Sequence, residues 1–150
     1  MNISGIHHVT LLIDDEEQAA WFYGEVLGLP EKPRPSFKFP GLFYHCGNQE
    51  IHLILTSRPL TREDLYIQVD ESAEITRRHI HRHAAFLVSE LDELEERLDE
   101  HDIEILFGPN HHGTEDELSR NMIESWMKMY SGIPIFVNDP TGNLIEFVPG

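Results

Sequence analysis

The predicted order of secondary-structure elements occurs twice along the chain, and this repeat constrains the fold more than any single motif. In each half, the hydrophobic pattern predicts a strand, an amphipathic helix and then three further strands. The first module is predicted to span about residues 1–57 and the second about residues 79–150, joined by a polar linker over about 58–78. We therefore expect an α+β fold in which two similar modules form a single domain of 150 residues.

The first module begins with an alternating strand, followed by a helix with one apolar face. The strand is predicted over residues 3–13, and the helix begins with Asp14 as its N-cap and Glu17 three residues later. Gly28 is predicted to end this helix. The apolar face consists of Ala19, Phe22, Tyr23, Val26 and Leu27. The three later strands are predicted at residues 31–39, a segment interrupted by prolines, and at 42–46 and 50–56.

The second module follows the same plan and adds a helical insertion. It is predicted to have strands over residues 79–88, 103–107, 133–138 and 143–148. Its first helix begins near Ser89, and Leu91, Leu94 and Leu98 lie on one face. The insertion, about residues 109–132, has a capping box at 114–117 and an apolar stripe of Leu118, Met122, Trp126, Met129 and Tyr130. This added helix is predicted either to cover the core or to form a lid over a site, and residues 139–142 are predicted to form only a turn.

The charge balance excludes some classes of partner. The 27 acidic and 11 basic residues give a formal net charge of −16, which argues against binding to nucleic acid or to an anionic membrane surface. The single cysteine, Cys46, allows no intrachain disulfide and favours a reducing compartment. The first residues show no signal-peptide pattern, and no apolar run approaches the length of a membrane span. We therefore expect a cytoplasmic protein.

Four polar residues occupy corresponding strands of the two modules. His8 and His83 lie in the first strands, and His52 and Glu146 lie in the last strands. The separation is 44 residues in the first pair and 63 in the second, and the insertion accounts for the difference. The neighbours of each residue are mostly apolar, so these four side chains are expected to point away from the helices. If each module forms a curved sheet with its helix outside, all four groups line one cavity.

Three imidazoles and one carboxylate in one cavity indicate a site for a divalent metal ion such as Zn, Ni, Co, Fe or Mn. A carboxylate such as Glu146, in the middle of a strand predicted to be buried, is costly unless it is paired, protonated or bound to a metal. Glu50 shares a strand face with His52 and is an alternative ligand. His79 and His81 share the face of His83 towards its exposed end, whereas His7 is expected to face the helix.

The chain resembles the vicinal oxygen chelate superfamily, which includes glyoxalase I, methylmalonyl-CoA epimerase, fosfomycin-resistance thiol transferases, extradiol dioxygenases and bleomycin-resistance proteins. Four segments support the resemblance: HHVTL (7–11), FYGEVLGL (22–29), RHAAFLV (82–88) and NDPTGNLIE (138–146). It implies paired βαβββ modules that form an open barrel of mixed sheet with the helices outside. It also implies one divalent metal ion with His8, His52, His83 and Glu146 as ligands, and a homodimer.

The resemblance further implies a glyoxalase-type lyase or isomerase that acts on a small molecule. In such enzymes the metal chelates vicinal oxygens of the substrate and stabilises an enediolate or oxyanion. Glu146 is the expected base, because the last-strand glutamate of glyoxalase-like members moves the proton. Where glutathione-dependent members have basic and amide side chains, this chain has Leu12, Thr56 and His79. Recognition of glutathione is therefore not predicted.

Other functions remain open on the same residues. An Fe(II) extradiol dioxygenase could use His8, His83 and Glu146, although His52 would then fill a position that oxygen or catechol requires. A fosfomycin-type thiol transferase is disfavoured, because Lys and Arg are scarce around the motifs. A non-catalytic protein that binds a drug or metabolite is the alternative from a different class, with apolar walls formed by Phe43, Trp126, Met129 and Tyr130.

Overall fold

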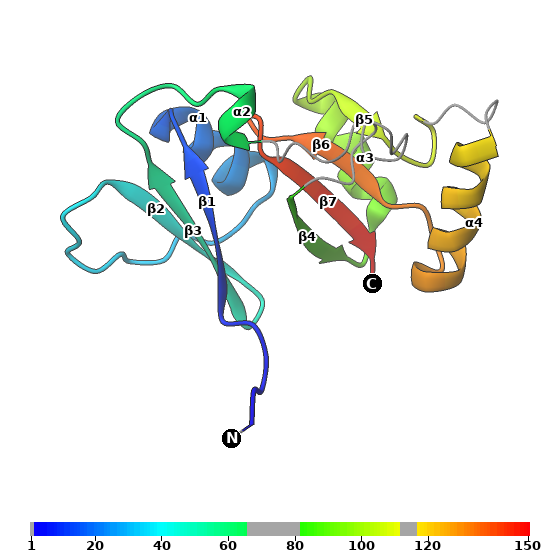
Figure 1. Ribbon diagram of the computed structural model, residues 1–150, viewed down its shortest axis with the longest axis horizontal. Helices are drawn as coiled ribbons and strands as arrows, with labels where there is room; N and C mark the ends of the chain where they lie inside the picture. Colours follow the sequence, from blue (N-terminus) through cyan, green and yellow to red (C-terminus); the bar gives the residue numbers. More distant parts are fainter. Residues whose placement is uncertain (1, 66–81, 112–116) are drawn as a thin grey trace. The chain divides into compact units, whose positions relative to one another are not determined.

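The computed structural model describes residues 2–65, 82–111 and 117–150. The chain divides into two compact units (Figure 1). Unit 1 contains Met1–Asp64 and Asp139–Asn143, and unit 2 contains Leu65–Asn138 and Leu144–Gly150. Across the described ranges, no helix is both long enough and apolar enough to cross a membrane. The predictions for His79 and His81 and for most of the capping box lie outside these residues.

Unit 1 is built on a three-stranded sheet of order β1-β3-β2. Strand β1 (His8–Ile13) runs parallel to β3 (Gln49–Leu55), which pairs antiparallel with β2 (Gly41–Cys46). The side chains of β1 alternate between exposed and more deeply buried positions, as the sequence predicts. The buried side chains Leu11, Ile13, Ile51 and Leu53 lie on one face and form the core of this sheet.

The first helix of unit 1 begins one residue later than predicted. Helix α1 (Glu16–Ala20) is capped by Asp15, whose Oδ1 accepts a hydrogen bond from the backbone N–H of Gln18 at 3.0 Å. The Asp14 side chain is directed instead towards the segment after β3, where its Oδ2 accepts a hydrogen bond from the N–H of Leu60 at 3.0 Å. The helix continues as a π-helical segment, η1 (Trp21–Val26), and the predicted end at Gly28 is confirmed by its φ of +66°.

The strand predicted over residues 31–39 is wrong. This segment forms only an isolated bridge between Glu31 and Tyr44. Pro33 and Pro35 have no backbone N–H to donate, so a continuous ladder cannot form there. Among the described residues, the sheet of unit 1 therefore has one strand fewer than that of unit 2.

Unit 2 has a four-stranded sheet of order β4-β7-β6-β5. Its strands are β4 (His83–Val88), β5 (Ile105–Phe107), β6 (Ile135–Asn138) and β7 (Leu144–Pro149). As in unit 1, the first strand runs parallel to the last, and the last pairs antiparallel with the strand before it. The predicted α+β fold class with mixed sheets is confirmed, and the sheet connections repeat as expected. The described residues form two separate mixed sheets and no closed barrel, so the predicted open barrel stays an expectation from the resemblance. The remaining helices are α2 (Arg62–Leu65), α3 (Leu91–Glu100) and α4 (Glu117–Tyr130).

The segment that joins β6 to β7 is more than the simple turn predicted for it. Asp139 is buried, and its Oδ1 accepts hydrogen bonds from the backbone N–H groups of Thr141, Gly142 and Asn143. Its Oδ2 accepts from the Tyr23 hydroxyl at 2.9 Å. Burial raises the pKa of Asp139, although these hydrogen bonds act in the opposite direction. Residues Asp139–Asn143 therefore belong to the core of unit 1, although they follow the insertion in sequence.

Candidate metal centre

The strand register places the candidate ligands at equivalent positions in the two sheets. In unit 1, His8 pairs with Glu50, and His52 lies two residues beyond that partner. In unit 2, His83 pairs with Leu144, and Glu146 lies two residues beyond that partner. Each sheet therefore has a histidine on its first strand diagonally adjacent to the candidate ligand on its last strand. This register makes His52 the structural counterpart of Glu146, whereas Leu144 occupies the position of Glu50.

In unit 1, the two candidate histidines contact each other. The rings of His8 and His52 stack with centroids 4.1 Å apart and an interplanar angle of 16°. The His52 Nε2 atom lies 2.8 Å from Glu50 Oε2, and Lys32 forms an ion pair with the other oxygen of Glu50. The Lys32 ammonium and then the His52 ring lower the pKa of Glu50 to about 2. Glu50 is therefore ionised and paired with Lys32 and His52, and the same contact engages the Nε2 atom of His52.

His7 differs from its prediction. Its Nδ1 atom lies 3.0 Å from His8 Nδ1, and the two rings meet edge to face. The expectation that this side chain faces the helix is therefore wrong. His7 precedes the first residue of β1, so the alternation of the strand does not fix its direction.

In unit 2, the candidate pair combines an imidazole with a buried carboxylate. His83 Nε2 lies 2.9 Å from Glu146 Oε2. The Glu146 side chain is 7% exposed, whereas that of His83 is 26% exposed. Burial raises the pKa of Glu146, and the neighbouring His83 acts in the opposite direction. The carboxylate of the pair is therefore almost closed to solvent, whereas its imidazole is partly accessible.

A phenylalanine lies beside each pair, at a position that the sequence interpretation did not recognise in unit 2. Phe43 pairs across the sheet with His52, and Phe136 pairs with Glu146 in the equivalent register. The Phe43 ring stacks on the His52 ring, with centroids 3.7 Å apart and an angle of 1°. Phe136 meets His83 edge to face at 6.1 Å. The signal was present in the sequence, because both residues lie on the strand that precedes the last strand of each module.

The inserted helix α4 contacts the unit 2 sheet next to the strand position of Glu146. Trp126 packs against Phe136 at 5.7 Å and against Phe107 at 5.1 Å. From Arg120 to Tyr130, none of the side chains of this helix is fully buried, and Met129 is 67% exposed. Trp126 therefore joins this helix to the strand that pairs with Glu146. The other side chains from Arg120 to Tyr130 are partly or fully exposed to solvent.

The distances between candidate donor atoms can be compared with those around a metal ion. Two donors that each lie about 2.1 Å from one ion at a right angle are about 3.0 Å apart. The 2.9 Å between His83 Nε2 and Glu146 Oε2 is compatible with this separation and is also the distance of a hydrogen-bonded ion pair. In unit 1, His52 Nε2 is already engaged by Glu50. Among the residues that the structure describes, no group of three or more His, Cys, Asp or Glu side chains is arranged to hold a metal ion. The four predicted ligands are divided two and two between the units, so their convergence on one ion stays a prediction.

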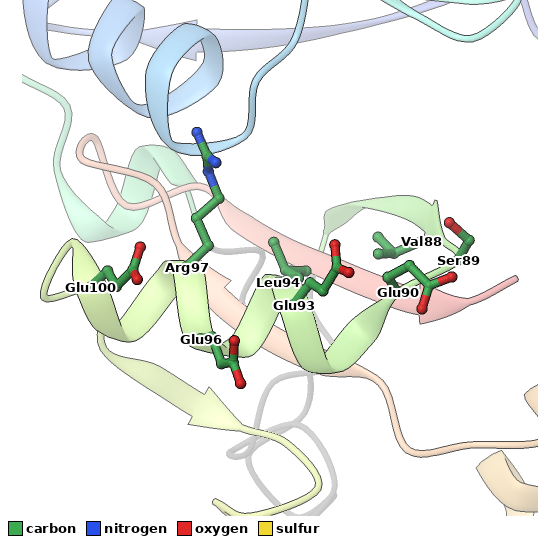
Figure 2. Close-up of a pocket in the computed structure, with 8 residues that line it drawn as sticks. All are labelled: Val88, Ser89, Glu90, Glu93, Leu94, Glu96, Arg97 and Glu100. Carbon is green, nitrogen blue, oxygen red and sulfur yellow. The ribbon is translucent and has the colours of Figure 1, made fainter.

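A separate hollow of about 390 Å³ runs along α3 in unit 2 (Figure 2). None of the four candidate ligands lines it. Its lining residues are Val88, Ser89, Glu90, Glu93, Leu94, Glu96, Arg97 and Glu100. Figure 2 shows that most of these side chains project from the helix itself. With four carboxylates and one guanidinium, this hollow offers none of the imidazole donors that the predicted metal site requires.

Comparison with known proteins identifies the family. The chain belongs to the Glyoxalase/Bleomycin resistance protein/Dioxygenase superfamily, whose model matches residues 5–147. The family predicted from the sequence is therefore confirmed. No curated protein is similar enough to count as a relative.

Solved structures confirm the fold. A glyoxalase family protein from Bacillus anthracis is 29% identical, with a TM-score of 0.65 over 100% of this chain and 98% of that one. Lactoylglutathione lyase from Agrobacterium tumefaciens is 22% identical, with a TM-score of 0.58 over 100% of this chain and 96% of that one. A mutant of the fosfomycin resistance protein FosX from Listeria monocytogenes, complexed with Mn(II) and a dihydroxypropylphosphonic acid, is 17% identical. Its TM-score is 0.65 over 99% of this chain and 94% of that one.

Proposed function

We propose that this chain is a metal-dependent lyase or isomerase of glyoxalase type that acts on a small substrate with vicinal oxygens. The observation that supports this most strongly is the His83–Glu146 pair, in which a nearly buried carboxylate lies 2.9 Å from an imidazole. The equivalent register of His8 and His52 gives unit 1 a matching pair of candidate ligands, and the resemblance implies that the two pairs hold one ion. A divalent ion bound by these residues would supply Lewis acidity to two adjacent substrate oxygens and would stabilise an enediolate or oxyanion.

Glu146 is the proposed base. Its burial raises the pKa of the carboxyl, which brings its proton affinity closer to that needed for proton transfer at neutral pH. The carboxylate takes a proton from the carbon next to the substrate carbonyl and returns it to a neighbouring position, so that no other reactant is consumed. Phe136 pairs with Glu146 across the sheet and is buried, which places an apolar side chain next to the carboxylate.

Solvent exchange tests the proton transfer directly. With metal-loaded protein in deuterium oxide, we expect deuterium incorporation into an α-hydroxy or α-keto substrate. Glu146→Gln should lower this exchange by about 10²–10⁴-fold, because a positioned general base contributes that factor. The variant should retain part of its metal, because the histidine ligands remain. Exchange at the wild-type rate in Glu146→Gln would rule out the base role.

A matched control uses the other buried glutamate of unit 2. Glu95 is 8% exposed and accepts hydrogen bonds from Asn110 at 3.1 and 3.0 Å, and its Oε1 lies 3.1 Å from the His111 ring. Glu95→Gln removes a buried carboxylate that does not belong to the His83–Glu146 pair. We therefore expect deuterium exchange to stay near the wild-type rate. Consumption of oxygen with catechols would instead indicate a dioxygenase. Ligand binding without metal or turnover would indicate a non-catalytic binding protein.

A further inference from the structure

The residues between η1 and β2 place two cations next to the candidate site of unit 1. Lys32 is neutralised by its ion pair with Glu50. Arg34 is not: in the part of the chain that the structure describes, no carboxylate pairs with it. Basic residues are scarce around the motifs, and these two come from the segment before β2 rather than from a motif.

Aromatic rings hold the Arg34 guanidinium in place. Its central carbon lies 5.0 Å from the Phe39 ring, 5.5 Å from the Phe37 ring and 5.9 Å from the Phe43 ring. One Nη atom donates to the Phe39 backbone carbonyl. Contacts with ring faces stabilise the positive charge but do not use the N–H donors along the edge of the guanidinium. The side chain is therefore fixed in position while part of its hydrogen-bonding capacity is unused.

The unused capacity includes a buried atom. Arg34 Nε is buried and has no hydrogen-bond partner among the described residues. A buried donor without a partner is rare, because its desolvation is not compensated. Nε is enclosed, so a ligand would meet the half-buried guanidinium at its terminal Nη groups, which can donate two parallel hydrogen bonds. Carboxylate, phosphonate and phosphate groups have the geometry for such a bidentate contact.

Phe43 connects this guanidinium to the candidate metal ligands. The same phenyl ring lies 3.7 Å from the His52 ring and 5.9 Å from the Arg34 guanidinium carbon. Arg34 and His52 therefore contact the same ring, so the guanidinium lies in the same part of unit 1 as the candidate ligand. We propose that Arg34 is a specificity-determining residue that binds an anionic group, a carboxylate, phosphonate or phosphate, of the substrate. This inference rests on the proposed function and deepens it by naming the class of substrate.

The test uses metal-free protein, so that it is independent of the proposed metal chemistry. Inorganic phosphate, methylphosphonate and acetate are titrated separately, and the Arg34 Nε–H resonance is followed by NMR. We expect saturable binding of at least one anion with a shift of that resonance. Arg34→Met, which keeps an apolar side chain among the rings, should weaken binding by roughly tenfold or more, because a charge-assisted contact is lost. Arg34→Lys should retain part of the affinity and confirm that the aromatic cluster still folds.

Lys38→Met is the matched control, because Lys38 is an exposed cation of the same segment. It should leave the affinity within about twofold, as expected for a screened surface charge. Equal losses in Arg34→Met and Lys38→Met would show general attraction of anions and would overturn the proposal. Absence of saturable binding in the wild type would also overturn it. Because no metal is present, neither result bears on the proton exchange at Glu146. The relative affinities for acetate, methylphosphonate and phosphate identify which anionic group the site prefers.

Discussion

The two units present the same strand register around different chemical groups. Unit 1 brings two imidazoles together, His8 and His52, and unit 2 brings together His83 and the carboxylate of Glu146. In both sheets a phenylalanine pairs with the residue on the last strand. The difference shows that the repeated backbone determines where a functional side chain lies, whereas the residue type determines its charge and its burial.

The units also differ in how their last hairpins are closed. In unit 1, the turn between β2 and β3 is exposed at Gly47 and Asn48. Between β6 and β7, Asp139 and Asn143 are buried, and Asn143 also donates to the backbone carbonyl of Leu12 at 2.8 Å. The second turn therefore contributes to the core of unit 1, and the first turn has no corresponding role. This difference predicts unequal effects of mutation.

Removal of the Asp139 carboxylate is expected to have the largest effect on stability. Asp139→Ala leaves the Tyr23 hydroxyl and the backbone N–H groups of Thr141 and Asn143 without their acceptor, which should cost about 3 kcal/mol of unfolding free energy. Asn48→Ala, in the exposed turn, should change it by no more than about 0.5 kcal/mol. Urea unfolding monitored by circular dichroism measures both values. Equal losses in the two variants would show that the hairpins do not differ in this way.

The two phenylalanines test whether the units are equivalent in packing. Phe43 is 5% exposed and Phe136 is 3% exposed. Each Phe→Leu substitution should cost about 1–2 kcal/mol, because each removes buried ring contacts and leaves a small cavity. The same unfolding measurement applies, with Leu87→Ala, an 80% exposed position, as the control. A loss in only one of the two variants would mean that the repeat extends to register but not to packing.

Glu50 distinguishes the units electrostatically, because unit 2 has Leu144 at the equivalent position. The pKa of Glu50 is lowered to about 2 in the folded chain, chiefly by Lys32. Its contribution to stability is therefore complete above the unfolded pKa of about 4.3 and is lost as the pH falls towards about 2. In metal-free protein, Lys32→Met should move the pKa of Glu50 upwards, and Lys38→Met should not. Carboxyl ¹³C NMR measures both values, and titration of wild-type Glu50 near its ordinary pKa would contradict the ion pair.

The sequence predicted the features that depend on the alternation of apolar and polar residues along a strand. The directions of His8 and His83 follow from the apolar residues beside them, and the sheet register confirms that Glu146 corresponds to His52. It did not predict the contacts of side chains that are distant in the chain, such as the hydrogen bond from Tyr23 to Asp139. The proline segment before β2 was misread as a strand, because its apolar residues suggested one although its prolines cannot pair. The position of Arg34 among the rings follows from that irregular backbone, which no periodicity reveals.

The central claim is that both pairs of residues bind one and the same metal ion. The most direct measurement is the metal content of dialysed protein, determined by mass spectrometry after loading with Mn, Fe, Co, Ni or Zn. We expect about one ion per chain, and loss of most of it in both His52→Ala and His83→Ala, because a site with three imidazoles and a carboxylate needs ligands from both units. Full retention of metal in either variant, or less than about 0.2 ion per wild-type chain, would contradict the account.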